Sequence, residues 1–313
     1  MMYDVVAIGN PVYDIIITPF VRSKGRVLSG CSVNALLALR RLGFNRVALI
    51  GSIGKDYLYK IKEDLRNFGI RNFALIEADT TCGFELVYDE KGDRTLKVLG
   101  LGSKITSHDI PDEYLKAKYI ILGPVLYEID YSLIEYVATA SDAKVLLDPQ
   151  GLTRRIGKDG FIEHFCDCRS LRRVAQYLDF IKPNEKESLF ITGEVDPFRA
   201  AKLLVEWGAE VGIVTLAERG SVAFDGELFY RVPAYRTVAV DPTGAGDVYA
   251  GALIAGLLEG YHLPEALLLA SAAASIKVEH CGPTFPVTRA EAERRYYAIR
   301  PSLEVYESPP GNY

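Results

Sequence analysis

The sequence predicts an α/β protein in which helices cover both faces of a mostly parallel sheet. Short runs of β-branched and aliphatic residues alternate with segments of helical periodicity, a pattern typical of parallel sheets. With 313 residues, 49% of them hydrophobic, the chain can bury a large core. Two separated segments carry short β-rich runs instead. We therefore expect a single α/β domain over residues 1–313, with a small β lid from about 12–29 and 80–100.

Apolar periodicity places the elements in order along the chain. Alternation with β-branched residues indicates a strand, and apolar residues three and four apart indicate a helix. The expected strands lie at residues 4–8, 15–18, 46–50, 84–88, 95–99, 119–122, 144–147, 178–181, 211–216, 221–224 and 228–232. The expected helices lie at about residues 30–42, 55–68, 132–140, 196–207, 244–258, 264–278 and 289–299. Because open α/β sheets bind ligands beyond the carboxyl ends of their strands, we expect the lid to lie over that crevice.

The composition narrows the class of partner. A net charge of −5 gives no argument for nucleic acid or an anionic membrane surface as a partner. The first residues lack the pattern of a signal peptide, and the apolar stretches are too short or too periodic to span a membrane. Five irregularly spaced cysteines favour free thiols over a disulfide framework or a metal set. We expect a cytoplasmic protein with neither nucleic acid nor a membrane as its partner.

The most informative segment is D-P-T-G-A-G-D at residues 241–247, which opens an apolar, helix-forming run. Glycines expose backbone amides, and a helix start adds positive partial charge, so the segment predicts an anion site. Asp247 would compete with that anion unless it abstracts a proton beside a phosphate. We interpret Asp247 as a general base, with the turn at Gly244 and the amides of Ala245, Gly246 and Asp247 holding the transferring phosphate. A plain helix-capping aspartate is the alternative.

Other common catalytic patterns are missing from the sequence. It contains no G-x-x-x-x-G-K-[ST] loop, no H-E-x-x-H motif and no G-x-S-x-G elbow. The glycines at 244 and 246 begin like a dinucleotide-binding fingerprint, but Tyr249 stands where the third glycine would be. Phosphoryl transfer remains, because it needs positioning, charge neutralisation and a base.

An ordered set of segments resembles the ribokinase-like carbohydrate kinases, also called the phosphofructokinase-B family. The segment at 241–247 is similar to the family signature D-T-x-G-A-G-D. The upstream matches are G-N-P-V-Y-D at 9–14, S-G-C-S-V-N at 29–34, the run from R-L-G to G-S-I-G-K-D at 41–56, K-P-N-E-K-E at 182–187 and V-T-L-A-E-R-G at 214–220. The resemblance covers nearly the whole chain and implies a three-layer α/β/α fold with a mostly parallel sheet and a small β lid.

The resemblance also implies roles for residues outside the anion site. The residues implied for the substrate hydroxyls are Asp14, Gly30 and Asn34. Those implied for the nucleotide are Asn184, Thr215, Ala217 and Gly220. Glu187 is implied for Mg²⁺, through water, and Asp241 is a candidate ligand of a monovalent cation. A capping or solvated role is the alternative for each, and only their order along the chain favours function.

The implied activity is ATP- and Mg²⁺-dependent phosphorylation of a hydroxyl on a small polyhydroxy compound. A sugar is ranked first, with a nucleoside and myo-inositol as alternatives. A non-catalytic sugar or nucleotide sensor on the same fold is the alternative of another class. Three departures from the family pattern, Ser29, Ala217 and Pro242, affect the expected substrate and cation dependence more than the reaction. The sequence does not decide between ATP, ADP and another phosphate donor, or whether the protein forms a homodimer.

Overall fold

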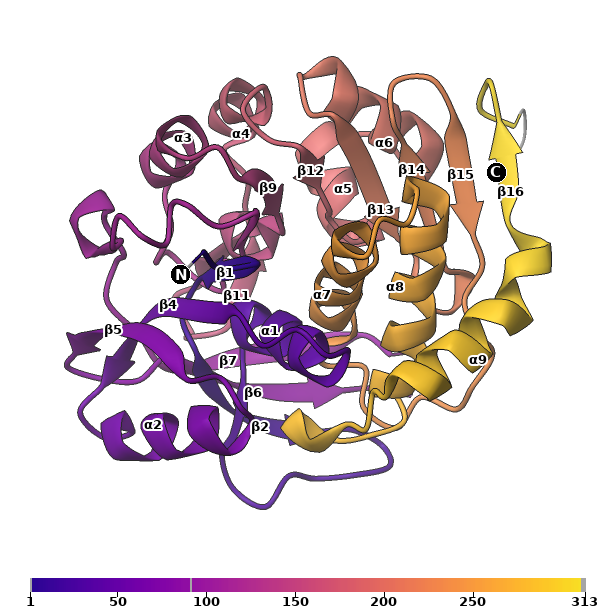
Figure 1. Ribbon diagram of the computed structural model, residues 1–313. Coiled ribbons are helices and arrows are strands. Elements are labelled where there is room, and N and C mark those ends of the chain that lie inside the picture. The colour runs from indigo at the N-terminus through magenta and orange to yellow at the C-terminus, as the bar shows by residue number, and fades with distance from the viewer. Residues whose placement is uncertain (1, 91, 311–313) are drawn as a thin grey trace.

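The computed structural model describes residues 2–90 and 92–310, and its centre is a ten-stranded sheet (Figure 1). Its strands are β1 (Val5–Ile8), β4 (Val47–Gly54), β5 (Asn72–Ala78), β8 (Tyr119–Leu122), β9 (Lys144–Leu147), β12 (Phe180–Ile181), β13 (Val211–Thr215), β14 (Ser221–Phe224), β15 (Phe229–Val232) and β16 (Glu304–Tyr306). They lie in the order β16-β15-β14-β13-β12-β9-β8-β1-β4-β5. Neighbours from β13 to β5 are parallel, and β14, β15 and β16 add an antiparallel edge. The predicted mostly parallel α/β class is confirmed.

Helices cover both faces of this sheet. One layer contains α1 (Cys31–Arg41), α2 (Leu58–Asn67), α7 (Ala245–Leu258), α8 (Leu263–Lys277) and α9 (Arg289–Ile299). The other contains α3 (Tyr131–Ala140), α4 (Cys168–Ala175), α5 (Glu185–Thr192) and α6 (Pro197–Glu206). Strand β1 faces both layers, because Val5 and Ala7 pack in the first cluster and Val6 and Ile8 in the second. Burial on both faces explains why the parallel strands read as continuous apolar runs.

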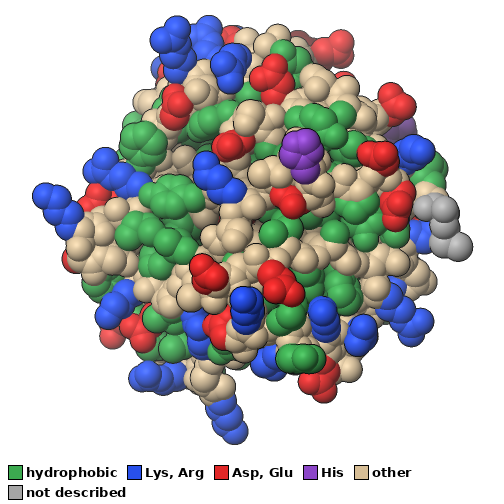
Figure 2. All heavy atoms as spheres, turned by 90° about the vertical axis from the view of Figure 1, so that its left-hand side faces the viewer, with side chains coloured by type: hydrophobic (Ala, Val, Ile, Leu, Met, Phe, Trp, Pro, Cys, Tyr) green, Lys and Arg blue, Asp and Glu red, His purple; other side chains and the backbone are tan. Residues whose placement is uncertain are grey.

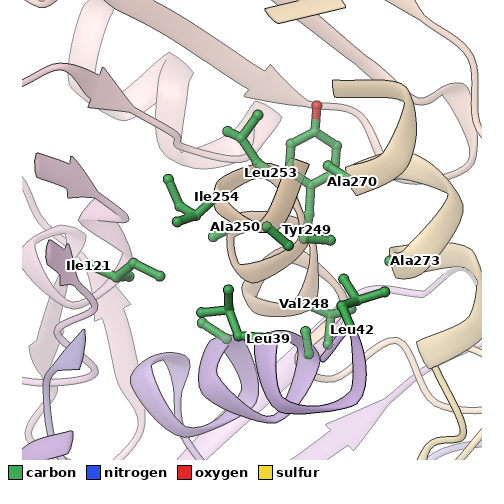
Figure 3. Packing of buried hydrophobic residues seen from close by; sticks show 14 of the residues in the cluster. Leu39, Leu42, Ile121, Val248, Tyr249, Ala250, Leu253, Ile254, Ala270 and Ala273 are labelled. Atoms are coloured by element: carbon green, nitrogen blue, oxygen red, sulfur yellow. The ribbon is translucent and has the colours of Figure 1, made fainter. Parts of the chain in front are cut away.

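Helix α7 lies between α1 and α8 and is apolar almost all round, as a helix packed on several sides must be (Figure 3). Val248 and Leu253 of α7 pack in the same buried cluster as Leu39 of α1. Gly251 permits the close approach of α1, since a Cβ at this position would lie 2.2 Å from the carbonyl oxygen of Ala35. This packing holds the first turn of α7 against α1.

A second sheet, which we call the lid sheet, is formed by the two β-rich segments. Its strands are β2 (Val12–Ile17), β3 (Val27–Ser29), β6 (Gly83–Tyr88) and β7 (Arg94–Gly100), in the order β3-β2-β6-β7. Strands β2 and β6 pair in parallel although they are far apart in sequence, while β6 and β7 form the expected hairpin. Residue 91, in the expected turn of that hairpin, lies outside the described residues. Phe84 and Leu86 pack on Val125, so the lid sheet has a small core of its own.

Several elements were not predicted from the sequence. They are β3, β5, β16, α4, α5 and the hairpin of β10 (Arg154–Ile156) with β11 (Ile162–His164). Strand β5 is partly buried along most of its length and lacks alternation, and α5 begins at the N-x-x-E segment for which the resemblance implies nucleotide binding by Asn184 and Mg²⁺ binding by Glu187. The β10–β11 hairpin extends the lid sheet through a bridge between Lys97 and Phe161. Such long-range pairing leaves no local periodic signal.

The outer surface agrees with the modest net charge. Figure 2 shows a face on which basic and acidic side chains are interspersed among apolar and neutral ones. Within the described residues, no helix combines the length and the apolar character that crossing a membrane requires.

Candidate active site

Polar side chains from neighbouring parallel strands meet at the carboxyl edge of the central sheet. Asp148 directly follows β9, Lys182 directly follows β12, and Thr215 is the last residue of β13. These three strands are neighbours in the sheet. Because carboxyl ends of parallel strands share one edge, the fold brings residues from three separate segments to one crevice.

The anion turn predicted at residues 241–247 begins helix α7. Gly244 occupies the left-handed region, with φ 81°, and α7 starts at Ala245. A Cβ on Gly244 would lie 2.5 Å from Nδ2 of Asn34, so both the backbone angle and the packing require glycine here. The amide of Ala245 donates to the carbonyl of Pro242 at 3.2 Å. The amides of Gly246 and Asp247 therefore offer the first-turn donors that a helix cannot satisfy internally.

Asp247 is buried and held in a fixed orientation. Its Oδ2 accepts a hydrogen bond of 2.9 Å from Nδ2 of Asn34, which lies on α1. Burial, followed by the charge of Asp148, raises the pKa of Asp247, whereas Asn34 and Lys182 oppose the shift. A carboxyl group with a raised pKa is a better proton acceptor than an exposed aspartate, which suits a general base.

A buried ion pair lies beside Asp247. Nζ of Lys182 is 2.7 Å from Oδ2 of Asp148, and both side chains are about 95% buried, being 3% and 5% exposed. Burial disfavours the charged amine, but the Asp148 carboxylate holds the pKa of Lys182 above its ordinary value. The same ammonium lies next to Gly246, since a Cβ there would be 3.4 Å from Nζ. Lys182 therefore adds a positive charge to the predicted anion site.

Glu187 is fixed by the start of helix α5. Its Oε2 accepts from the amide of Asn184, and Oδ1 of Asn184 accepts from the amide of Glu187, both at 2.9 Å. This reciprocal arrangement is a capping box. Burial and the charge of Asp148 raise the pKa of Glu187. Thus the two residues assigned to the nucleotide and to Mg²⁺ also start a helix, and Glu187 lies within electrostatic reach of Asp148.

The carboxylates at this edge suit a divalent cation. One ligand atom each of Cys31, Asp148 and Asp247 lies within 4.8 Å of the others. Burial raises the pKa of the Cys31 thiol well above its ordinary value, so a carboxylate oxygen, such as that of Asp148, suits Mg²⁺ better than this sulfur. Glu187 adds a third buried carboxylate, and the positive charges of Lys182, Arg94 and Arg154 act on this group of carboxylates.

The substrate-side residues lie where the lid sheet meets α1. Asp14, on β2, is 3% exposed, and its Oδ1 accepts from the amide of Phe84 at 2.8 Å. Burial raises the pKa of Asp14 to about 7, opposed by the Phe84 amide, Ser29 and the charge of Arg154. Gly30 precedes α1 with φ 108°, and a Cβ there would lie 2.8 Å from the carbonyl oxygen of Asn10. The lid sheet thus supplies both the carboxylate and the amide that orients it.

Thr215, Ala217 and Gly220 form a tight turn after β13. The amide of Thr215 donates to the carbonyl of Pro183, and Leu216 donates to Gly220 at 2.8 Å. Ala217 adopts φ 52°, the left-handed conformation that its glycine counterpart in the family pattern would adopt without strain. A Cβ on Gly220 would lie 1.9 Å from the carbonyl oxygen of Val232, so this glycine is required by packing.

Asp241 lies behind the anion turn and is fully buried. Its Oδ1 accepts from the amide of Thr243 at 2.9 Å, and its Oδ2 accepts from the amide of Gly282 at 3.1 Å. The ammonium of Lys277, at the end of α8, faces the same carboxylate at 3.4 Å. An ammonium group of the chain itself therefore faces the carboxylate that the resemblance makes a candidate ligand of a monovalent cation.

The sequence prediction missed four residues of this site. Asp148 and Arg154 belong to a D-P-Q-G segment followed by R-R, for which a substrate-cleft loop and a plain turn with solvated arginines are equally good interpretations of the sequence. Lys182 and Lys277 had not been singled out. For Lys182 the signal was its position immediately before Pro183 at the end of a buried strand. For Lys277 it was a charge at the end of a mostly apolar helix whose other charged residue, Glu265, lies in the first turn.

Comparison with known proteins identifies the class. A family model described as pfkB family carbohydrate kinase matches residues 4–290. The fold and the site define a phosphotransferase that has an alcohol group as acceptor. The chain belongs to the pfkB family of carbohydrate kinases.

Individual relatives support this assignment. A cytidine kinase of Thermococcus kodakarensis is 30% identical over 276 residues, which cover 86% of this chain and 93% of that protein. A ribokinase of Lactococcus lactis is 25% identical, with coverage of 85% and 84%. A solved pyrophosphate-dependent kinase of the ribokinase family, complexed with a pyrophosphate analog and myo-inositol, superposes with a TM-score of 0.79 at 21% identity, covering 93% of this chain and 99% of that one. The last likeness shows the shared fold.

Proposed function

We propose that this protein is an ATP- and Mg²⁺-dependent kinase that phosphorylates a hydroxyl of a small polyhydroxy compound, with Asp247 as general base. The observation that carries the proposal is the 2.9 Å hydrogen bond from Asn34 to Asp247. It joins the start of α1, on the substrate side, to the start of α7, on the phosphate side. Asn34 engages Oδ2 and the Cys31 thiol also hydrogen-bonds the carboxylate, but two carboxylate oxygens offer about four acceptor sites, so capacity remains for the proton of an incoming hydroxyl.

The proposed reaction is an in-line transfer. The substrate hydroxyl gives its proton to Asp247 while its oxygen attacks the γ-phosphorus, and the bond from that phosphorus to the bridging oxygen breaks. ADP departs with the bonding electron pair. The amides of Gly246 and Asp247 and the ammonium of Lys182 stabilise the negative charge on the transferred group.

The metal and the nucleotide have separate proposed sites. Mg²⁺ on the nucleotide phosphates would neutralise charge, held through water by Asp148 and Glu187, because this ion keeps much of its hydration. The turn from Thr215 to Gly220, together with Asn184, would border the nucleotide. The bridge between Asn184 and Thr215 supports this assignment, because it brings both segments to one edge of the crevice.

The acceptor is proposed to be a compound with neighbouring hydroxyls. Asp14 uses Oδ1 for the Phe84 amide, which leaves acceptor sites on both oxygens for such a pair of hydroxyls. A sugar, a nucleoside ribose and a cyclitol all present this group. Relatives named cytidine kinase and ribokinase support the first two, so we place sugars and nucleosides ahead of inositol. A cytoplasmic location and a small-molecule partner complete the proposal.

The decisive test measures phosphoryl transfer from Mg-ATP to ribose, fructose, cytidine, myo-inositol and ribose 1-phosphate. We expect turnover with one class of acceptor and a loss of about 10²–10⁴-fold in kcat for Asp247→Asn, the range that a general base contributes. Asp130→Asn is the control, because Asp130 is also an aspartate at a helix start, where it caps α3 by accepting from the amide of Leu133. If no acceptor gives turnover that Asp247→Asn abolishes, the kinase assignment fails. Turnover with pyrophosphate alone would overturn the choice of ATP.

A further inference from the structure

Lys277 is a buried lysine that the proposed reaction does not use. It ends helix α8, and its side chain is 1% exposed. Its ammonium contacts three oxygens: the carbonyl of His280 at 2.8 Å, the carbonyl of Asp241 at 3.3 Å and Oδ2 of Asp241 at 3.4 Å. The ring of Phe285 closes another side, with its centroid 5.8 Å from Nζ. The cation is thus enclosed by oxygens and an aromatic ring, as an ion in a binding cavity would be.

The contacts account for all the hydrogen-bonding capacity of this ammonium. A lysine has three N–H donors and no acceptor, and three oxygen acceptors lie within reach. A separate monovalent cation would need the same Asp241 oxygens and would meet the positive charge of Lys277 at close range. The geometry around Asp241 therefore fits a tethered ammonium and does not fit an additional metal ion.

Lys277 is linked to the anion turn through Asp241. The carboxylate that faces Lys277 also fixes the amide of Thr243, the residue before the left-handed turn at Gly244. The backbone on the other side is fixed as well, because the amides of Val240 and Asp241 both donate to the carbonyl of Val278, at 2.7 and 2.9 Å. Removing the ammonium would leave the buried Asp241 carboxylate without its cation and free this loop to move.

We infer that Lys277 is a built-in cation that positions the anion turn and makes the protein independent of any bound monovalent metal ion. Lys277 is a positioning residue, since it acts on the transferred phosphate only through Asp241, Thr243 and the amides that follow. This inference uses the proposed kinase activity for one of its two readouts. The other readout, thermal stability, does not depend on that activity.

The first experiment uses the wild-type protein. Its melting temperature and its turnover are measured in chloride salts of potassium, sodium, ammonium and tetramethylammonium at equal ionic strength. We expect both quantities to be the same in all four salts. Stabilisation or activation by potassium over tetramethylammonium would overturn the inference, and this result requires no variant.

The second experiment uses Lys277→Ala, with Lys202→Ala as control. Lys202 lies on the surface of α6, where it pairs with Glu206. For Lys277→Ala we expect a lower melting temperature and a loss of turnover of up to about 10²-fold, as misplaced catalytic groups cause. Potassium, ammonium or methylammonium should restore part of both, whereas tetramethylammonium, which is too large for the vacated space, should not.

The two readouts separate the possible failures. A Lys277→Ala protein with wild-type turnover, or one that no small cation rescues, would contradict the positioning role. If no acceptor gives turnover in any protein, the kinase proposal fails, but the melting temperatures still test Lys277. If the Lys277→Ala variant does not fold in any salt, including potassium, then a small cation cannot replace the lysine ammonium. The salt response of the wild-type protein then tests whether the protein is independent of a monovalent metal ion.

Discussion

At the scale of single residues, the site is built from carboxylates whose environments differ. Asp14 and Asp247 are both buried, yet Asp14 is oriented by a lid amide and Asp247 by the side chain of Asn34. Their residue types and order could be predicted from the sequence because each belongs to a short motif. Their burial could not be predicted, since it depends on how the lid sheet and α1 pack over them. Burial is also the main cause of both raised pKa values.

The raised pKa of Asp14 leads to a pH dependence. In the free protein Asp14 is protonated below about pH 7, and a protonated carboxyl loses part of its capacity to accept hydroxyl protons. We expect kcat/KM for the acceptor to fall as the pH drops below about 7, because this ratio reports groups of the free enzyme. In Asp14→Asn the acid limb should move to lower pH, while kcat/KM at neutral pH drops. An acid limb at the same pH in both proteins would contradict this assignment.

The raised pKa of Asp14 also makes stability depend on pH, in the opposite direction. Activity should fall as the pH drops, whereas stability should fall as the pH rises. A folded-state pKa above the unfolded value means that Asp14 favours folding below the unfolded pKa of about 3.9 and loses that contribution as pH rises through about 7. Asp14→Asn cannot ionise. We therefore expect the free energy of unfolding of Asp14→Asn, minus that of the wild type, to rise between pH 4 and pH 8, as measured by denaturant titration of the protein without ligands.

At the scale of elements, the distance between α1 and α7 sets the geometry of the base. Helix periodicity predicted both helices, and the glycine turn predicted where α7 begins. The spacing between them could not be predicted. In the sequence, Gly251 is only a residue that disfavours a helix, and its contact with Ala35 of α1 is known only from the structure. Asn34 adjoins Ala35, so this close approach also positions the hydrogen bond to Asp247.

Gly251→Ala tests this spacing. The new Cβ would lie 2.2 Å from the Ala35 carbonyl oxygen, so the two helices must separate. We expect the free energy of unfolding to fall by about 1–3 kcal/mol, as overpacked cores do. We also expect kcat to fall by up to about 10²-fold, because a shift of about 1 Å can cost that much.

The matched variant is Gly256→Ala on the same helix. Its Cβ would face α8, with Ala266 atoms at 3.0 and 3.1 Å, a milder contact on the side away from Asn34. We expect a smaller loss of stability and an almost unchanged kcat. Equal losses of kcat in both variants, measured under saturating substrate, would show that the spacing of α1 and α7 does not control the base.

At the scale of the whole molecule, the lid sheet contacts the anion turn directly. The hydroxyl of Tyr88, on β6, lies 3.0 Å from Oγ1 of Thr243 and accepts from Nη1 of Arg94 at 3.0 Å. This contact joins the lid sheet to the anion turn, on the phosphate side of the site. A lid held shut excludes water, which protects the phosphoryl donor from hydrolysis.

Tyr88→Phe tests the role of that contact. Removing one hydroxyl costs about 1 kcal/mol, or roughly fivefold in the closed population. We expect a higher ratio of ADP formed to phosphorylated product, because water competes with the acceptor in a looser site. Tyr59→Phe, on an 88% exposed side chain of α2, should leave the ratio unchanged. An unchanged ratio in Tyr88→Phe would mean that other contacts hold the lid.

The sequence by itself determined the α/β class, the order of the motifs and the anion turn at the start of α7. These features depend on local rules, namely apolar periodicity, glycine conformation and helix-end chemistry, which act over a few residues. Only the tertiary structure decided which charges face one another. Asn34 and Asp247 are 213 positions apart, and Lys277 and Asp241 are 36 apart. Such pairs form because the packing of helices and strands brings them together, and no local pattern carries that information.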